Sequence, residues 1–325
     1  MELQDIAPNI CSGRDKPSSN GKVVLYGSTG VIGMTESASY WDELILVARV
    51  GANAGQLQFA NSPCGVTDNA LVINAHEWNT YIYYYLQYYN LNRLVFGSGQ
   101  PLITGGMLKK IKIKSCKNVE RLKITHLLSL LDERIETQRK VIEKYESLIR
   151  GLCENLTRQG TANKTINECL ECHSFTLQES SVLEYGKYPV YGATGVCGYT
   201  DTPDVSGDGI LIIKDGASVG TTSYAEGCYS AIGTLNLLTA KQDINLRYVY
   251  YCLKVMNFAP YKTGLAIPHI YFKDYGKHKI WCPSFEQQSR IAYVLTKIDN
   301  KIQIEKSLLE CLNSQKRYML NQLFI

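Results

Sequence analysis

The chain has 325 residues, of which 45% are apolar, so it is long enough for two or three domains with sizeable cores. Its net charge of +4, from 34 basic and 30 acidic side chains, is too small to identify a nucleic-acid-binding protein by itself. No apolar run approaches the roughly 20 residues that span a bilayer, and 11 cysteines without a signal-peptide pattern favour reduced thiols. We therefore expect a cytoplasmic protein that has no membrane partner.

The most informative feature of the sequence is an internal duplication. Four segments of the first half return in the second half: 26–33 as 191–198, 51–55 as 216–220, 81–86 as 248–253, and 131–135 as 298–302. The first two repeats are 165 residues apart and the last two 167 apart, so the second copy carries a two-residue insertion between Gly220 and Tyr248. A duplication this long predicts a molecule with an internal pseudo-two-fold. Such a molecule suits a ligand that is itself nearly two-fold, and double-stranded DNA is the commonest of these.

Each copy begins with a mixed, glycine-rich part. In the first copy, short apolar runs at 23–25, 44–47 and 71–73 are separated by Gly, Asn, Ser and Pro, which predicts short strands joined by tight turns. Helical spacing of apolar residues predicts a helix over about Asn79–Asn90, with a counterpart over about Asn245–Asn257. Turn-rich loops follow at 97–101 and 264–268, and each is expected to lead into a lysine-rich strand.

The glycine turn at 27–30 returns at 192–195, which favours a structural turn in which Gly supplies a positive φ. The alternative is that its backbone amides and hydroxyls contact DNA phosphates. Two weak basic patches, around Lys109–Lys117 and Lys273–Lys279, either follow a phosphate backbone or are solvated lysine edges.

Each copy ends in a long helix without proline, whose apolar residues alternate in steps of three and four, the spacing of a coiled-coil seam. The seam of the first helix consists of Leu128, Leu131, Ile135, Gln138, Ile142, Tyr145, Ile149 and Leu152. The seam of the second helix consists of Leu295, Ile298, Ile302, Glu305, Leu309, Leu312, Lys316 and Met319.

Helices of about 37 residues, roughly 55 Å long, need another long helix as a packing partner, and each would find it in its own duplicate as an antiparallel pair. Polar Gln138 and Glu305, and Lys316 in the position equivalent to Ile149, would fix the register. Alternatively, the helices cap separate domains or form a homodimer.

Motifs of catalysis and metal binding are weak. The sequence contains no phosphate-binding Gly-x-x-x-x-Gly-Lys-Ser/Thr loop, no His-Glu-x-x-His and no strand followed by Gly-x-Gly-x-x-Gly. Ser218 matches the Gly-x-Ser-x-Gly pattern, but the duplicate has Asn53 there, so the loop persists without a nucleophile. Cys169, Cys172 and His173 match a haem-attachment pattern, yet they have no second Cys/His pair to complete a zinc site. We expect no catalytic residue, no metal and no cofactor bound by this chain.

In combination, the paired turns, the glycine loops, the segment 66–71 and the long helices resemble the specificity subunit of type I restriction-modification systems. The run Pro283-Ser284-Phe285-Glu286-Gln287 looks like that family's Pro-x-x-Glu-Gln lead-in to a helix, and the resemblance covers essentially the whole chain. The first copy departs from the pattern, because Cys116-Lys117-Asn118-Val119-Glu120 occupies the equivalent place.

The resemblance implies an α+β fold with two mixed α/β target recognition domains, separated by two long helices that form an antiparallel coiled coil. The expected boundaries are residues 1–118 for recognition domain 1, 119–158 for the central helix, 159–284 for recognition domain 2 and 285–325 for the C-terminal helix.

It also implies a non-catalytic subunit whose two domains each read one half of a bipartite, asymmetric DNA target, with the helices setting the spacer. The implied partners are double-stranded DNA, two methyltransferase subunits and restriction subunits. S-adenosylmethionine and ATP are expected on those partner subunits.

Polar and basic residues of the glycine-rich loops are the candidates for DNA contact, since Arg and Gln bind base edges in pairs of hydrogen bonds, while Lys and Ser more often hold phosphates. In the first domain they are Ser28, Thr29, Arg49, Asn53 and Gln100, with Lys109 and Lys110 for the DNA backbone only. In the second domain they are Thr194, Lys214, Ser218, Lys262 and His269. For each residue, turn capping or surface solvation is the competing interpretation.

Three other functions compete with this interpretation, of which an enzyme is the weakest and would be excluded by dialysed protein with no turnover and no bound metal. Of the other two, one is the recognition subunit of a smaller, type IIG-like restriction system, which shares the architecture. The other is a coiled-coil adaptor whose globular ends bind protein, in which case DNA binding with a strong salt dependence is not expected.

Overall fold

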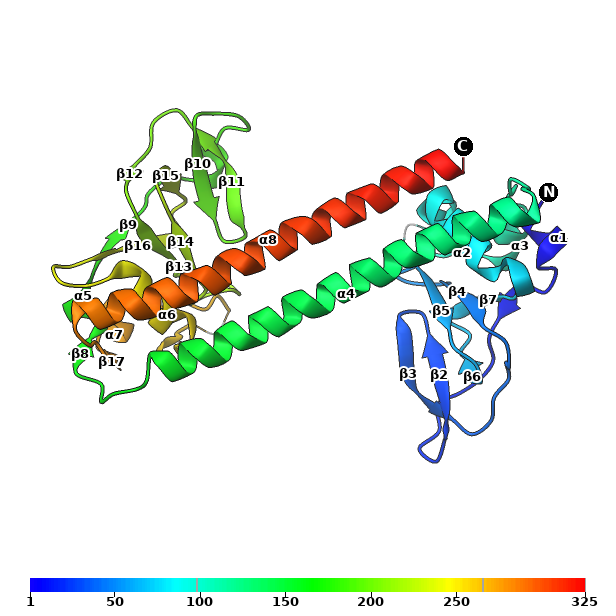
Figure 1. The fold of residues 1–325 in the computed structure, drawn as a ribbon, viewed down its shortest axis with the longest axis horizontal. Coiled ribbons are helices and arrows are strands. Elements are labelled where there is room, and N and C mark those ends of the chain that lie inside the picture. The colour runs from blue at the N-terminus through cyan, green and yellow to red at the C-terminus, as the bar shows by residue number, and fades with distance from the viewer. Residues whose placement is uncertain (98, 265, 325) are drawn as a thin grey trace. The chain divides into compact units, whose positions relative to one another are not determined.

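The computed structural model describes residues 1–97, 99–264 and 266–324 (Figure 1). Ser98 and Leu265, which fall in the loops predicted at 97–101 and 264–268, lie outside the described residues. The chain divides into two compact units. Unit 1 combines Met1–Arg139 with Leu308–Ile325, and unit 2 is Lys140–Ser307.

Unit 1 contains two sheets and several helices. Its strands are β1 (Cys11–Ser12), β2 (Val23–Gly27), β3 (Gly30–Thr35), β4 (Leu44–Ala48), β5 (Leu57–Ala60), β6 (Cys64–Val66) and β7 (Ala70–Ile73). Its helices are α1 (Leu3–Ile6), α2 (Asn79–Tyr89), α3 (Gly105–Lys109) and the first part of α4 (Asn118–Leu156), with 3-10 turns at His76–Trp78 and Leu91–Leu94. One sheet has the order β1-β7-β4-β5 and the other β3-β2-β6.

Unit 2 repeats this arrangement. Its strands are β8 (Lys164–Thr165), β9 (Leu170–Ser174), β10 (Tyr188–Gly192), β11 (Gly195–Thr200), β12 (Val205–Ser206), β13 (Gly209–Ile213), β14 (Thr222–Ala225), β15 (Cys228–Ala231), β16 (Leu235–Ala240) and β17 (Lys279–Ile280). Its helices are α5 (Ile166–Cys169), α6 (Leu246–Lys254), α7 (Phe272–Tyr275) and the first part of α8 (Phe285–Leu323), with 3-10 turns at Glu179–Ser181 and Ala259–Tyr261.

The sheets of unit 2 have the orders β9-β16-β13-β14 and β11-β10-β15-β12, with β17 paired to β8. The sheet β1-β7-β4-β5 therefore has an equivalent in β9-β16-β13-β14, strand for strand. The α+β class predicted from the sequence is confirmed, and so is the duplication.

The central strand of each unit is buried on both of its faces. In β4, Ile45 and Val47 join the core beneath α2, while Leu44 and Leu46 join the core against the second sheet. In β13, Ile210 and Ile212 pack toward α6, while the alternate residues face the second sheet. Successive side chains of a strand point to opposite faces, so two-sided burial requires the continuous apolar runs seen in the sequence.

The two long helices, each of 39 residues, are present as predicted. Helix α4 begins in unit 1 and ends in unit 2, whereas α8 begins in unit 2 and ends in unit 1. Each unit therefore contains one stretch of α4 and one stretch of α8, and the two stretches run in opposite directions. In unit 1, Leu131 and Ile135 pack with Leu312. In unit 2, Ile149 and Ile302 share one core.

The unusual lead-in to α4 does not move the start of the helix, since Asn118 and Phe285 are equivalent positions. At the start of α8, the buried Gln288 side chain accepts a hydrogen bond from the Asn245 backbone amide at 2.9 Å and donates to the Pro283 carbonyl at 2.9 Å. The equivalent Arg121 instead donates to Asn118 Oδ1 at 2.7 Å and stacks over the Trp78 ring at 4.1 Å. Different contacts therefore hold equivalent helix ends.

The prediction of lysine-rich strands after the turn loops is wrong in unit 1. The Thr104 hydroxyl accepts a hydrogen bond from the Met107 amide and starts helix α3 there. Beyond α3, the carbonyls of Lys112 and Lys114 accept hydrogen bonds from the hydroxyls of Tyr85 and Tyr81, at 2.8 and 3.0 Å. Pairing of this segment is limited to an isolated bridge between Lys112 and Glu2, so no strand forms there. In unit 2, α7 precedes the two-residue strand β17.

Candidate functional site

In each unit, two glycine-rich loops that are distant in the sequence lie side by side. In unit 1, the Gly51 amide donates to the Pro101 carbonyl at 2.9 Å and the Ile103 amide donates to the Arg49 carbonyl at 2.9 Å. We call residues 49–55 with 99–103, and residues 214–220 with 266–270, the loop pairs of units 1 and 2. The pair in unit 2 is held identically, by Gly216 to Pro268 and Ile270 to Lys214, both at 3.0 Å.

The side chains on this shared frame differ between the units. In unit 1, Arg49 donates to the Asp68 carbonyl at 3.3 Å, and Asn53 accepts from the Gln56 side chain at 3.0 Å. The predicted Gln100 is exposed on the second loop of the pair. The three predicted residues therefore belong to one surface region, with Arg49 and Asn53 held by local hydrogen bonds.

In unit 2, the loop pair carries Lys214, the exposed Ser218 and His269. His269 Nδ1 and Asp215 Oδ1 are 2.7 Å apart, and both side chains are about one-third exposed, at 36% and 34%. The positions equivalent to Asp215 and His269 in unit 1 are Val50 and Leu102, which are also neighbours through an isolated bridge. The same backbone frame thus holds an ionisable pair in unit 2 and an aliphatic pair in unit 1.

A cavity of about 670 Å³ adjoins the loop pair of unit 2. Lys214, Asp215 and His269 line it together with Asn236, Tyr271 and Lys273. Burial raises the pKa of Cys172, which also lines the cavity, to about 11, so its thiol is neutral near pH 7. The sequence did not single out Asn236 or Tyr271, because no local pattern shows that β16 and the segment before α7 meet at one site.

The predicted Ser28, Thr29 and Thr194 lie in hairpin turns, β2–β3 and β10–β11. Gly30 and Gly195 have φ values of 116° and 111°, so the predicted structural role of these glycines is confirmed. Thr29 and Thr194 are exposed, and the following Val31 and Val196 are 60% and 51% exposed. In unit 1, the Gln58 side chain donates to the Gly27 carbonyl at 2.6 Å, which ties the turn to β5. Among the described residues of unit 2, no hydrogen bond joins the Thr194 turn to the loop pair.

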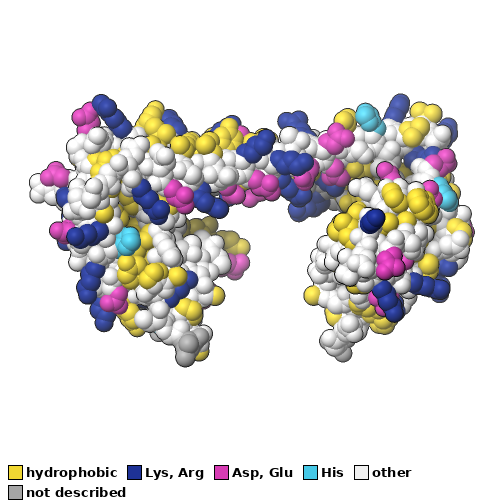
Figure 2. All heavy atoms as spheres, turned by 90° about the horizontal axis from the view of Figure 1, so that it is seen from below, with side chains coloured by type: hydrophobic (Ala, Val, Ile, Leu, Met, Phe, Trp, Pro, Cys, Tyr) yellow, Lys and Arg dark blue, Asp and Glu magenta, His cyan; other side chains and the backbone are white. Residues whose placement is uncertain are grey.

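The remaining candidates lie near the loop pairs in the sequence. Lys109 ends α3 and is half-buried, and Lys110 is exposed just beyond it. Lys262 is exposed, next to Thr263, whose amide donates to the His269 carbonyl at 2.9 Å. On the face drawn in Figure 2, basic and acidic side chains are interspersed, so no wide field of one sign marks the binding surface there.

The predicted seam positions are all buried or half-buried. Polar Gln138 and Glu305 are 9% and 8% exposed, and both have partners. Two ion pairs involve the polar seam residues: Lys316 Nζ lies 2.6 Å from Asp132 Oδ1, and Lys301 Nζ lies 2.5 Å from Glu305 Oε1.

The cysteine motif does not converge on a site. Cys169 is fully buried, whereas His173 is exposed and contacts the Thr239 hydroxyl at 3.2 Å. Within residues 1–97, 99–264 and 266–324, no three His, Cys, Asp or Glu side chains gather as metal ligands. In the same ranges, no helix is both long and apolar enough to cross a membrane.

Comparison with known proteins identifies this architecture. The profile of the family described as the type I restriction modification DNA specificity domain matches twice, over residues 10–146 and 162–314. A Mycoplasma genitalium protein named as a candidate type I specificity subunit is 26% identical over 304 residues, which are 85% of this chain and 79% of that protein. The specificity subunit of the Escherichia coli type I restriction enzyme EcoprrI is 29% identical over 112 residues, 34% of this chain and 28% of that protein.

The fold is similar to the crystal structure of the type I restriction-modification S subunit from M. genitalium. The TM-score is 0.74 at 21% sequence identity, over 100% of this chain and 95% of that one.

Proposed function

This chain belongs to the family of type I restriction-modification DNA specificity domains and is a non-catalytic DNA-recognition subunit with two target recognition domains, and we propose how those domains divide the work. Residues 1–118 and 159–284 each read one half of a bipartite target, and the helices over 119–158 and 285–325 set the unread spacer. A helix of roughly 55 Å covers about 16 base pairs of 3.4 Å rise, enough for two domains on one duplex.

The duplicated loop pair with unlike side chains is the observation that supports this proposal. Arg49 and Lys214 occupy equivalent positions, and both are cations suited to phosphate contact. Val50 and Leu102 in unit 1 are replaced by Asp215 and His269 in unit 2, so equivalent positions present different chemistry to base edges. Because the two loop pairs share a backbone conformation but carry different side chains, we expect a target with two unlike halves.

The hairpins β2–β3 and β10–β11 are proposed to enter the major groove, which admits a two-stranded β-ribbon. Thr29 and Thr194 lie at the tips, and the exposed Val31 and Val196 offer apolar contact to thymine methyl groups. Ser28, Asn53, Gln100, Ser218 and Lys262 supply further polar contacts, and Lys109 and Lys110 hold the DNA backbone.

The outer faces of α4 and α8 are proposed to dock two methyltransferase subunits, which in turn recruit restriction subunits. Large apolar side chains are exposed there: Val119, Leu122, Leu127, Leu130, Leu148, Phe285, Tyr293, Val294, Ile304 and Tyr318. Such exposure is typical of a surface that is covered by a partner. S-adenosylmethionine and ATP bind to those partner subunits, and the assembly works in the cytoplasm.

The proposal is tested by co-expressing the chain with type I methyltransferase subunits and mapping adenine methylation in the host genome by single-molecule sequencing. The expected result is one split motif with two unlike halves and a fixed gap. His269→Ala is expected to relax one position of one half-site only, since a base contact contributes about 1–3 kcal/mol of discrimination. A soluble, assembled complex that produces no split motif would contradict the proposal.

Lys214→Ala is expected to weaken DNA binding about equally for all sequences and to lower the salt slope, −d log K/d log[salt], by about 1, because one phosphate contact is lost. Titration of labelled duplexes between 50 and 200 mM salt, roughly the range in which such contacts are resolved, measures both quantities. Lys144→Ala removes the same charge from an exposed position on α4 and serves as the control. Equal slopes for the two variants would remove Lys214 from the DNA interface.

A further inference from the structure

Two consecutive tyrosines join the mixed domain of each unit to the long helix beside it. In α2, the ring centres of Tyr83 and of Phe59 in β5 are 4.3 Å apart, while the Tyr84 hydroxyl points to α4. In α6, the ring centres of the equivalent Tyr250 and of Tyr224 in β14 are 5.6 Å apart, while the Tyr251 hydroxyl points to α8. The first tyrosine of each dipeptide thus contacts the sheet, and the second contacts the long helix.

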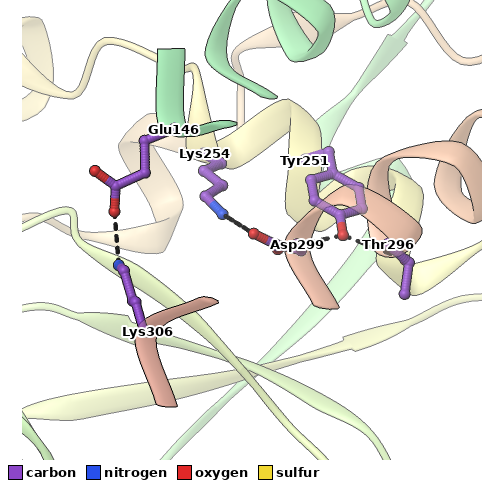
Figure 3. Close-up of polar contacts among 6 residues, drawn as sticks. All are labelled: Glu146, Tyr251, Lys254, Thr296, Asp299 and Lys306. Atoms are coloured by element: carbon purple, nitrogen blue, oxygen red, sulfur yellow. Dashed lines mark hydrogen bonds and ion pairs between the residues drawn. The ribbon is translucent and has the colours of Figure 1, made fainter. Parts of the chain in front are cut away.

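The contact with the long helix is polar and nearly identical in the two units. The Tyr84 hydroxyl donates to Asp132 Oδ2 at 3.0 Å and lies 3.3 Å from Ser129 Oγ. The Tyr251 hydroxyl donates to Asp299 Oδ2 at 3.3 Å and lies 3.2 Å from Thr296 Oγ1, as Figure 3 shows. We call Tyr84 with Asp132, and Tyr251 with Asp299, the latches of units 1 and 2.

The cation that balances the aspartate differs between the latches. In unit 1, Lys316 of α8 lies 2.6 Å from Asp132 Oδ1, and its ammonium group lies 5.4 Å from the centre of the Tyr84 ring. In unit 2, Lys254 of α6 lies 3.0 Å from Asp299 Oδ1 (Figure 3). The positions equivalent to Lys316 and Lys254 are Ile149 and Gln87, respectively. The two copies therefore share the tyrosine and the aspartate, while the lysine comes from different elements.

Burial raises the pKa of Tyr84 and of Tyr251, so both phenols stay protonated near neutral pH and can donate a hydrogen bond. A hydrogen bond to a charged acceptor is directional, unlike the apolar packing around it. The latch can therefore fix an angle between two packed helices that apolar contacts alone leave free to shift.

We propose that the latches set the orientation of each recognition domain on its long helix and thereby select the spacer length of the DNA target. This inference rests on the proposed function, in which the domains read two half-sites across a fixed gap. Tyr84, Asp132, Tyr251 and Asp299 are positioning residues, because they act on the gap through domain orientation.

The two latches are not expected to be equally important. Beside the unit 2 latch, a cavity of about 430 Å³ is lined by Lys254, Asp299, Glu146 and Lys306, and Glu146 and Lys306 form an ion pair at 2.6 Å. Space next to a contact lets the helices shift when the contact is lost. Around α2 of unit 1, Phe324 packs against the rings of Tyr81 and Tyr85. The loss of the Tyr251 hydroxyl should therefore relax the gap more than the loss of the Tyr84 hydroxyl.

The test uses the assembled methyltransferase complex and plasmids that carry the two half-sites with the native gap or with gaps one base pair longer and shorter. Initial methylation rates give the preference for the native gap. In Tyr251→Phe, this preference is expected to fall about tenfold, which corresponds to about 1.4 kcal/mol. The recognised half-site sequences are expected to stay unchanged.

Tyr248→Phe is the matched control, because its buried hydroxyl donates to the Trp281 carbonyl at 2.6 Å and does not reach the latch. In unit 1, Tyr85→Phe plays the same part for Tyr84→Phe. A fixed gap in the wild type with an unchanged preference in Tyr251→Phe would overturn the latch alone, as would an equal change in Tyr248→Phe. A wild-type complex without a split target would overturn the proposed function and the latch together.

Discussion

Replacing Phe324 with alanine is expected to lower the free energy of unfolding of unit 1 by about 3–5 kcal/mol, the usual cost of deleting a buried aromatic ring. The Phe324 side chain is 3% exposed. The centre of its ring lies 5.3, 5.4 and 5.8 Å from the ring centres of Tyr81, Tyr85 and Tyr88. It therefore fastens the end of α8 to α2. Hydrogen exchange of the purified chain should show lost protection in α2 and in the last turns of α8.

The equivalent position in unit 2 is not filled by an aromatic ring. Thr157 is the equivalent of Phe324, and a cavity of about 230 Å³ is lined there by Thr157, Cys252 and Val255, the last two being equivalents of Tyr85 and Tyr88. Phe285→Ala, which removes the same ring from a position that is 53% exposed, is the control and should change stability by less than about 0.5 kcal/mol. Equal destabilisation by both substitutions would refute the anchoring role of Phe324.

Gly220→Ala is expected to destabilise unit 2 by about 2–6 kcal/mol, from two separate causes. Gly220 has a φ of 91°, a strained conformation that costs other residues about 1–3 kcal/mol. A Cβ at this position would also lie 2.9 Å from Cβ and Cγ of Phe258, a core side chain, and such overpacking costs a further 1–3 kcal/mol, roughly. Urea denaturation of the purified chain, followed by near-ultraviolet circular dichroism, measures the change.

Gly216→Ala separates the two causes. Gly216 has a φ of 101°, but a Cβ there would meet no atom within 4 Å, so only the backbone cost of about 1–3 kcal/mol is expected. The exposed Ser218 between them should tolerate alanine within about 0.5 kcal/mol. If Gly216→Ala is as harmful as Gly220→Ala, then contact with Phe258 does not explain the glycine. Tolerance of alanine at Ser218 would also separate the structural role of the loop, which its glycines carry, from DNA contact by Ser218.

Much of the architecture was predictable from the sequence because it is encoded by local periodicity and by repetition. The seam spacing predicted both long helices, and the structure has them at equivalent starts, Asn118 and Phe285. The continuous apolar runs predicted strands such as β4, whose alternate side chains fill two different cores. The lysine-rich segment of unit 1 was predicted incorrectly, since it forms only an isolated bridge between Glu2 and Lys112, whereas its equivalent in unit 2 is the strand β17 paired with β8.

The sequence by itself thus determined the duplication, the fold class and the family, since these depend on local periodicity and on motifs that repeat along the chain. Only the tertiary structure decided which distant residues meet. Asp215 and His269, separated by 54 residues, form one pair because a loop after β13 lies against a loop before α7. Likewise, Lys254 and Lys316 balance equivalent aspartates from different helices. Such contacts are set by strand order, register and helix packing, which bring together residues whose own neighbours in the sequence carry no trace of the meeting.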